Sequence, residues 1–203
     1  LTGSFNGEGI KVSVFDGGRV YAEHTDFGSS ARITNKEADT VPYDSHATGV
    51  TGMIGSEGKD VSTRAGVFVG NTKATFDSYY FGNSTLDGET EEKDISTKIR
   101  DSKPALSNHS YGNVIGWSLE NGSMGVGFYW RGSYDPSNGR SYDLNGAYYG
   151  RDKELDDIVY NNPYMVVVKS AGNSYGKGPT SNTMFPGYYY RDSDGTWVQF
   201  SST

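Results

Sequence analysis

Apolar segments of two different periodicities alternate along this chain, and that alternation constrains the fold more than any other feature. Residues 10–16 and 74–81 are β-branched and aromatic, which is typical of strands. Residues 46–54 and 91–100 carry apolar side chains three and four positions apart, which is typical of helices. Residues 105–112 are predicted to form the next strand and its exit loop. The order strand, helix, strand, helix, strand predicts an α/β fold with a mostly parallel sheet.

The pattern resumes in the last third of the chain. Residues 151–161 are predicted to form a helix, because Leu155, Ile158 and Val159 make an apolar stripe. Residues 163–171 form a nearly continuous apolar run, which is typical of a strand buried on both faces. No regular element is predicted for the final thirty residues.

Residues 111–150 interrupt the alternation. They hold nine glycines and six tyrosines together with Trp117, Phe128 and Trp130, without sustained periodicity. A long aromatic-stapled surface insertion is the favoured interpretation. A separate sugar-binding module is an alternative that rests on composition alone.

Charge and composition exclude several classes of function. A formal net charge of −7 argues against a nucleic-acid or anionic-membrane partner, because both require a basic patch. No apolar run approaches the ~18 residues of a membrane span. The absence of cysteine excludes disulfides and thiolate metal sites. The start at Leu1, without a signal-like segment, favours a mature form or an excised piece.

Polar residues cluster where the predicted strands end and a helix begins. Asp16 ends the first strand, residues 110–112 follow a later one, and Asn173 follows the last. His46 starts the first helix, where the helix dipole favours a neutral imidazole. Because the carboxyl ends of parallel strands share one edge, these groups are expected to meet there. A carboxylate that orients an imidazole base, with an amide donor to an oxyanion, is the machinery of acyl transfer.

Five sequence blocks carry a resemblance to a known family. They are residues 12–18, 24–27, 46–52, 107–112 and 166–173. In this order they resemble the catalytic-aspartate, His-x-acid-apolar, catalytic-histidine, specificity-pocket and oxyanion blocks of the subtilisin-like serine proteases, the subtilases. The last two blocks are most similar in sequence to long secreted bacterial subtilases.

The resemblance covers about residues 3–173 and implies a three-layer α/β/α fold. It implies that Asp16 orients His46, that His46 is the general base, and that Asn173 is the oxyanion donor. It also implies a set of residues that bind the substrate backbone and wall the first specificity pocket: Ser110, Tyr111, Gly112, Ala171 and Gly172. His24 and His109 are interpreted as structural.

The sequence departs from the family pattern at three places. Gly17 replaces the usual serine or threonine, and Gly49 stands where a second histidine is common. The third departure is the nucleophile, because no serine after Asn173 opens a Gly-Thr-Ser block on an apolar helix. The serines rejected for this reason are Ser181, which follows Thr180, and Ser193, Ser201 and Ser202.

These observations predict that residues 1–203 are the amino-terminal portion of a subtilase catalytic domain, incomplete at its carboxyl end, with the insertion at about residues 111–150. The parent would be a secreted or cell-surface serine endopeptidase that acts on peptides or proteins and requires no cofactor. The chain alone is expected to be inactive. The alternative is a non-catalytic peptide-binding relative.

Two further expectations concern partners and metals. An incomplete sheet exposes an unpaired strand edge, so the chain is expected to associate with the missing part of the domain or with itself. Calcium is common in the family, but no acidic cluster here is regular enough to assign a site.

Overall fold

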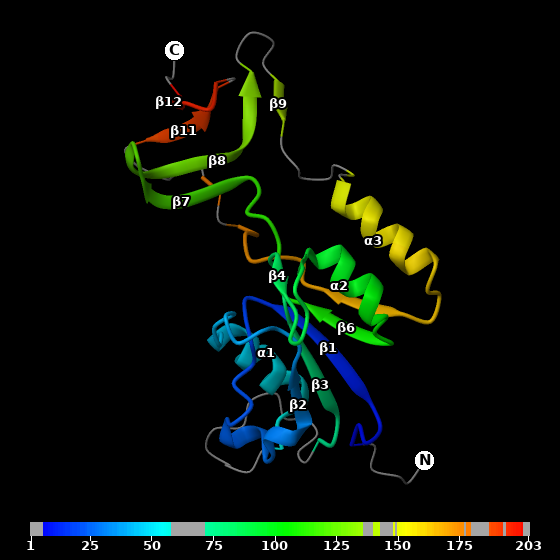
Figure 1. Cartoon of the computed structure of the whole chain (residues 1–203). Helices are drawn as coiled ribbons and strands as arrows, with labels where there is room; N and C mark the ends of the chain where they lie inside the picture. The colour runs from blue at the N-terminus through cyan, green and yellow to red at the C-terminus, as the bar shows by residue number, and fades with distance from the viewer. Residues whose placement is uncertain are drawn as a thin grey trace, which may run out of the picture. The chain divides into compact units, whose positions relative to one another are not determined.

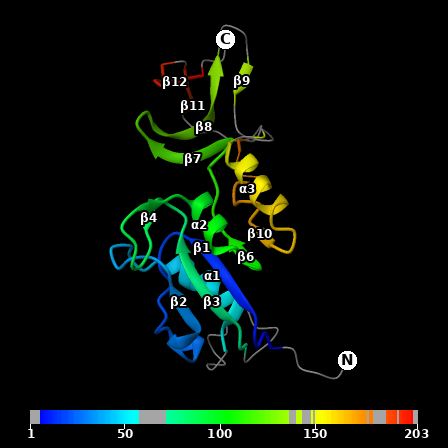
Figure 2. The same cartoon turned by 45° about the vertical axis from the view of Figure 1, so that its right-hand side comes forward.

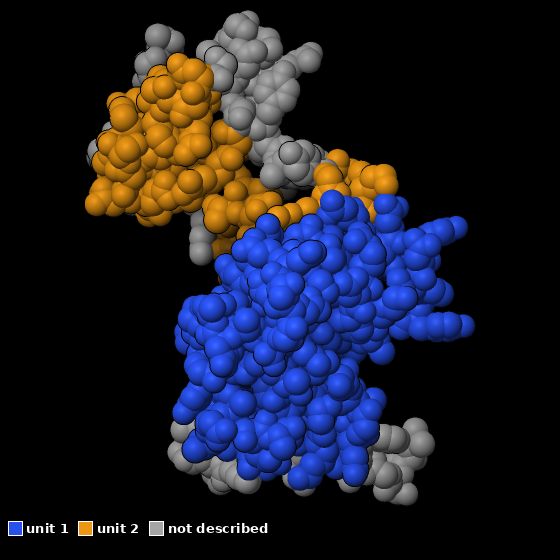
Figure 3. Space-filling model, in the orientation of Figure 1, with its two compact units in different colours: residues 1–111, 154–170 blue, residues 112–153, 171–203 orange. Residues whose placement is uncertain are grey.

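A computed structural model gives the structure of the chain, which forms two compact units (Figure 3). It describes residues 6–57, 72–135, 140–142, 148, 150–176, 178–179, 187–192 and 194–200. The first unit comprises residues 1–111 and 154–170, and the second comprises residues 112–153 and 171–203.

A five-stranded parallel sheet forms the centre of the first unit. Its strands are β1 (Lys11–Asp16), β2 (Ile33–Asn35), β3 (Thr75–Tyr80), β6 (Leu106–His109) and β10 (Val166–Lys169), in the order β10-β6-β1-β3-β2. The other elements of this unit are the 3-10 helices η1 (Thr25–Phe27) and η2 (Ser30–Arg32), helices α1 (Ser45–Gly55) and α2 (Ile95–Ser102), and the short hairpin of β4 (Ser84–Thr85) with β5 (Glu92–Lys93). Helix α3 (Gly150–Tyr160) leads into β10.

Helices cover both faces of this sheet, with α1 on one face and α2 and α3 on the other (Figures 1 and 2). Successive side chains of a strand point to opposite faces, so β1 contributes to two cores. Val12 and Val14 pack in the core that includes Ala47 of α1. Phe15 packs in the core that includes Ile99 of α2 and Ile158 of α3. The predicted α/β class with a mostly parallel sheet is therefore confirmed.

Side-chain caps set where the first two helices begin. The Asp44 carboxylate accepts a hydrogen bond from the Ala47 amide at 2.7 Å, so α1 begins at Ser45. Helix α2 begins at Ile95, four residues later than predicted, because β5 pairs with β4 and Asp94 caps the helix. Within the described residues, no helix has both the length and the apolar character needed to cross a membrane.

Strand β10 corrects one prediction from the sequence. Val166 and Val168 are 55% and 51% exposed, so this strand is not buried on both faces. It lies at the edge of the sheet, where β6 is its one described neighbour. Val167 points to the opposite face and packs against the core below α3. A continuous apolar run does not distinguish an edge strand with one open face from a central strand.

An antiparallel sheet forms the second unit, in the part of the chain for which no periodicity was found. Its strands are β7 (Trp117–Gly122), β8 (Gly125–Asp135), β9 (Arg140–Tyr142), β11 (Tyr188–Arg191) and β12 (Trp197–Gln199). The order is β12-β11-β8-β7, with β9 also paired to β8 and β11 parallel to β8.

Aromatic rings pack on one another within this second sheet. The ring of Tyr129 is fully buried, with the rings of Tyr189 and Trp197 each centred 4.8 Å away. A side chain at Gly127 would place its Cβ 2.5 Å from the Gly187 carbonyl oxygen, so glycine allows β11 to approach β8. These contacts show that aromatic rings and glycines of this unit pack its strands together.

A buried ion pair joins α2 to the loops at the carboxyl end of β3. Lys98 and Glu37 have fully buried side chains, and Lys98 Nζ lies 2.9 Å from Glu37 Oε1. The ammonium also donates to the carbonyl oxygens of Tyr80 and Gly82 at 2.8 and 2.9 Å. Ser84 donates to the second oxygen of Glu37 at 2.6 Å. Burial lowers the pKa of Lys98, while the contact with Glu37 opposes that shift.

Removing one charge of this pair should destabilise the protein strongly. Lys98→Met is expected to lower the free energy of unfolding by about 3 to 5 kcal/mol, because Glu37 is left buried without a counter-charge. The double variant Lys98→Met/Glu37→Met should recover part of that loss, because no buried charge remains, although the Tyr80 amide and the Tyr80 and Gly82 carbonyls lose their partners. Urea denaturation would measure the free energy of unfolding of both variants. Lys11→Met, which removes an exposed charge, should change the midpoint little. A double variant no more stable than Lys98→Met would contradict this account.

His109 is a core residue, as the sequence predicted. Its ring stacks on Phe15 with centroids 4.8 Å apart. Its two nitrogens lie 2.9 Å from the hydroxyls of Tyr111 and Ser107. Burial, with a smaller effect from the charge of Lys169, lowers the pKa of His109 from 6.5 to about 4.

This shift predicts a pH-dependent stability. The unfolded chain takes up the His109 proton at pH values where the folded chain does not, so stability falls as the pH decreases from 6.5 to about 4. The loss attributable to His109 should reach about 3 kcal/mol at the lower end. Urea titrations at several pH values would measure it. His109→Gln should flatten the pH dependence in this range, and an unchanged slope would contradict the assignment.

Candidate active site

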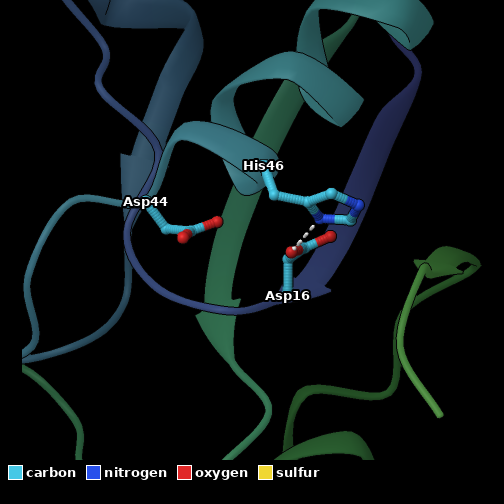
Figure 4. A group of neighbouring side chains, drawn as sticks. All are labelled: Asp16, Asp44 and His46. Atoms are coloured by element: carbon cyan, nitrogen blue, oxygen red, sulfur yellow. Dashed lines mark hydrogen bonds and ion pairs between the residues drawn. The ribbon is translucent and has the colours of Figure 1, made fainter. Parts of the chain in front are cut away.

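Asp16 and His46 lie in direct contact at the carboxyl edge of the parallel sheet (Figure 4). His46 Nδ1 is 2.6 Å from Asp16 Oδ1. Asp16 is buried at 2% exposure, whereas the side chain of His46 is 58% exposed. The carboxylate therefore fixes the ring from the protein side, while the rest of the imidazole remains accessible to a reactant.

Two chain segments are held side by side to create this contact. After β1, the amide of Arg19 donates to the Pro42 carbonyl at 2.9 Å, and the amide of Asp44 donates back to the Arg19 carbonyl at 2.9 Å. A side chain at Gly18 would place its Cβ 2.7 Å from the Pro42 carbonyl oxygen. Glycine is therefore required where the segment that precedes His46 crosses the end of β1.

Two carboxylates set the electrostatics of His46. The hydrogen bond that Asp16 accepts from the ring raises the pKa of His46, burial opposes this, and the charges of Asp16 and Asp44 raise it further. The helix dipole alone would favour the neutral ring, as expected from the sequence. At this site the carboxylates outweigh it, so the imidazolium is stabilised.

One oxygen of Asp16 carries both of the hydrogen bonds described for this carboxylate. Oδ1 accepts from the Gly17 amide at 2.7 Å and contacts His46. Oδ2 is buried and has no hydrogen-bond partner among the described residues. Gly17 offers no hydroxyl, and a Cβ there would lie 3.3 Å from the Asp44 carboxylate. Asp44 thus lies beside the position where the resemblance implies serine or threonine.

Asp44 has two roles near this site, and the sequence did not suggest the second of them. Its first role is to cap α1, through the hydrogen bond that it accepts from the Ala47 amide. One oxygen of Asp44, one oxygen of Asp16 and a ring nitrogen of His46 also lie within 4.8 Å of one another. The sequence did contain a signal for this second role, because Asp44 stands two residues before His46.

These three donors are the described residues at this site that could hold a metal ion. The 2.6 Å separation of His46 Nδ1 and Asp16 Oδ1 suits a shared proton. Two ligands of one cation at bond lengths of about 2.1 Å lie roughly 3 Å apart. The observed geometry therefore favours the proton, and no metal is assigned.

Ser110 and Tyr111 follow β6 at the same edge of the sheet. The register pairs Phe15 with His109, so Ser110 lies beside the end of β1. Its hydroxyl accepts from the side-chain amide of Asn108, with 3.0 Å between Nδ2 and Oγ. The ring of Tyr111 packs 5.0 Å from that of Phe81, and Lys169 Nζ lies 4.2 Å above it. These contacts hold the segment in place.

The other residues singled out from the sequence fall in the second unit or outside the described residues. Gly112, Ala171, Gly172 and Asn173 belong to the second unit, so their positions relative to His46 remain a prediction. The residues outside the described part of the chain are Thr180 and the rejected serines Ser181, Ser193, Ser201 and Ser202.

Comparison with known proteins gives one match. The model of the subtilase family matches residues 7–198 of the chain. No curated protein matches, and no solved structure matches.

The contact between His46 and its two acids predicts an order of pKa effects. Asp16→Asn should lower the pKa of His46 more than Asp44→Asn does, because the hydrogen bond to Asp16 is the larger cause of the raised value. Asparagine at position 44 keeps the helix cap. NMR titration of the His46 ring would measure both shifts. Asp39→Asn, which alters a highly exposed acid paired with Arg19, is the matched control and should leave His46 unchanged. Equal effects of the first two variants would count against this assignment.

Proposed function

The chain belongs to the subtilase family, and on this premise we propose that it supplies the base and the orienting acid of a serine endopeptidase. Membership supports a peptidase-like function with peptide or protein substrates. The observation that carries the finer proposal is the 2.6 Å contact between Asp16 and His46.

In this proposal, Asp16 keeps a proton on Nδ1 of His46, so Nε2 is free to accept one. As a serine hydroxyl attacks the scissile carbonyl, its proton passes to Nε2, and an oxyanion forms on the carbonyl oxygen. Asp16 and Asp44 stabilise the imidazolium that results. His46 then returns the proton to the leaving amine. Asn173 is proposed to donate its amide to the oxyanion, an interaction typically worth about 3 kcal/mol in the barrier.

The nucleophile is proposed to come from sequence outside residues 1–203. Support comes from β10: Val166 and Val168 are exposed, and β6 is the one strand that pairs with β10 among the described residues, which leaves an apolar face and a sheet edge uncovered there. A further strand and helix carrying the serine would cover both. Without them, the same edge is proposed to promote self-association.

The substrate is proposed to bind as an added strand along the segment that follows β6. Ser110 and Tyr111 are held beside the end of β1, where an extended peptide could pair with backbone groups. From the resemblance, Gly112 is assigned to the same substrate-binding strand, and Ala171 and Gly172 are assigned to the facing wall. Subtilases are commonly extracellular, and we propose a secreted or cell-surface location here as well.

A non-catalytic peptide-binding relative remains the second candidate. The departure that favours it is the lack of an assigned nucleophile. A binding role, however, requires neither a buried aspartate nor a histidine in contact with it, and this chain has both.

Labelling by a serine-directed fluorophosphonate probe would test the proposal. The product of the complete reading frame should be labelled, and His46→Ala should reduce labelling by at least about a thousandfold, because the serine loses its base. Met53→Ala alters an exposed residue of the same helix and serves as the control. The 203-residue chain alone should remain unlabelled.

Two results would contradict the proposal. Labelling of the 203-residue chain would show that one of its own serines is the nucleophile. Absence of labelling in the product of the complete reading frame, with the fold intact by circular dichroism, would favour the binding relative.

A further inference from the structure

A hollow lies beside α1, apart from the contact between Asp16 and His46. It has a volume of about 460 Å³, and His46 is not among its lining residues. Thr48, Gly49 and Gly52 of α1 form one side, at helical spacing. A Cβ built at Gly49 or Gly52 meets no atom within 4 Å. The space therefore exists because two positions of this helix face carry no side chain.

Aromatic rings form the other walls. Phe27 of η1 is buried and closes the hollow from inside, while Tyr21 and Tyr43 are about half exposed. The rings of Tyr21 and Tyr43 meet edge to face, with centroids 5.5 Å apart. The amide of Tyr21 donates to the Thr48 hydroxyl at 3.0 Å, which ties this wall to α1. The walls are thus fixed by contacts already present in the fold.

Two carboxylates line the same hollow. Asp26 is mostly buried, and its one ion-pair partner in the described part of the chain is His24, with 3.9 Å between Nδ1 and Oδ2. Asp44 enters from the start of α1. The lining residues include these two carboxylates and neither lysine nor arginine, so the hollow is acidic. Aromatic faces with unbalanced carboxylates attract a cation.

Arg19 contacts Tyr43, one of the rings that line the hollow, and shows that this ring can bind a guanidinium. Its guanidinium lies 4.5 Å from the centre of the Tyr43 ring. Its charge is balanced by Asp39, because Arg19 Nη1 is 2.7 Å from Asp39 Oδ1. In the described part of the chain, no lysine or arginine pairs with Asp26 or Asp44, so these carboxylates are left to a second cation. A planar guanidinium is weakly hydrated and stacks on aromatic rings, so it suits these walls better than an ammonium ion.

We propose that this hollow, bounded by the Gly49 face of α1 and the rings of Tyr21, Phe27 and Tyr43, is a binding site for a guanidinium on an aliphatic stem. The carboxylates of Asp26 and Asp44 pair with the cation, and the rings contact its stem and faces. The ligand is an arginine side chain of a peptide or a free guanidinium compound. The site shares Asp44 with the surroundings of His46, but the proposal does not depend on the proposed peptidase activity.

Isothermal titration calorimetry with the full chain at low salt would test this proposal. N-acetyl-arginine amide and N-acetylagmatine, each with one positive charge, are the probes, and N-acetyl-citrulline amide is the neutral isostere. Saturable binding of the two cations is expected, at least about tenfold tighter than binding of the citrulline derivative. Tighter binding of the arginine amide would assign the ligand to a peptide, and tighter binding of N-acetylagmatine would assign it to a free guanidinium compound.

Substitutions at Gly49 and Asp26 locate the site. Gly49→Leu should fill the hollow and weaken binding at least about tenfold, whereas Gly49→Ala should bind as the wild type does. Both replace a helix glycine by a better helix former, so folding should be retained. Asp26→Asn should weaken binding of the cations and leave that of the citrulline derivative unchanged. Absent binding, equal affinity for citrulline, or full affinity in folded Gly49→Leu would overturn the proposal.

Discussion

Strand β1 has strand neighbours on both edges, and most of the first unit is positioned from it. Pairing with β3 and β6 fixes β1 in the middle of the parallel sheet, so Asp16 is delivered to the carboxyl edge. The alternation of its side chains supplies Val14 to one core and Phe15 to the other, so α1 and α2 pack on opposite faces. A slip of one residue would exchange both sets of side chains and would also turn Asp16 away from His46.

Buried polar groups reinforce this arrangement at the same end of the sheet. The pair of Lys98 and Glu37 holds the loop after β3 against α2, and all of its described contacts are short and direct. His109 fills a core position beside Phe15 with both ring nitrogens bonded to hydroxyls. Polar groups in such surroundings are costly unless they are paired, so each network favours one arrangement of the strand ends. The proposed active site is built on that fixed edge.

Asp44 connects the three features that surround α1. It caps the helix, it contributes to the raised pKa of His46, and it lines the hollow proposed to bind a guanidinium. A cation bound in that hollow would partly neutralise Asp44 and so lower the basicity of His46. The two proposed sites are separate in their lining residues, but this one carboxylate gives them a physical link.

The sequence alone determined the α/β class, most elements of the first unit, and the pairing of Asp16 with His46, because periodicity and strand-end position are local properties of the chain. It did not determine that β10 is an edge strand, since the same apolar sequence suits a strand with one face packed against the core and a strand with both faces packed. It also missed the second sheet, whose stability comes from aromatic rings packed across strands rather than from alternation within them. The double role of Asp44 and the hollow beside Gly49 were decided only by tertiary structure, because both depend on segments brought together from distant positions: residues 19–27 and 43–52.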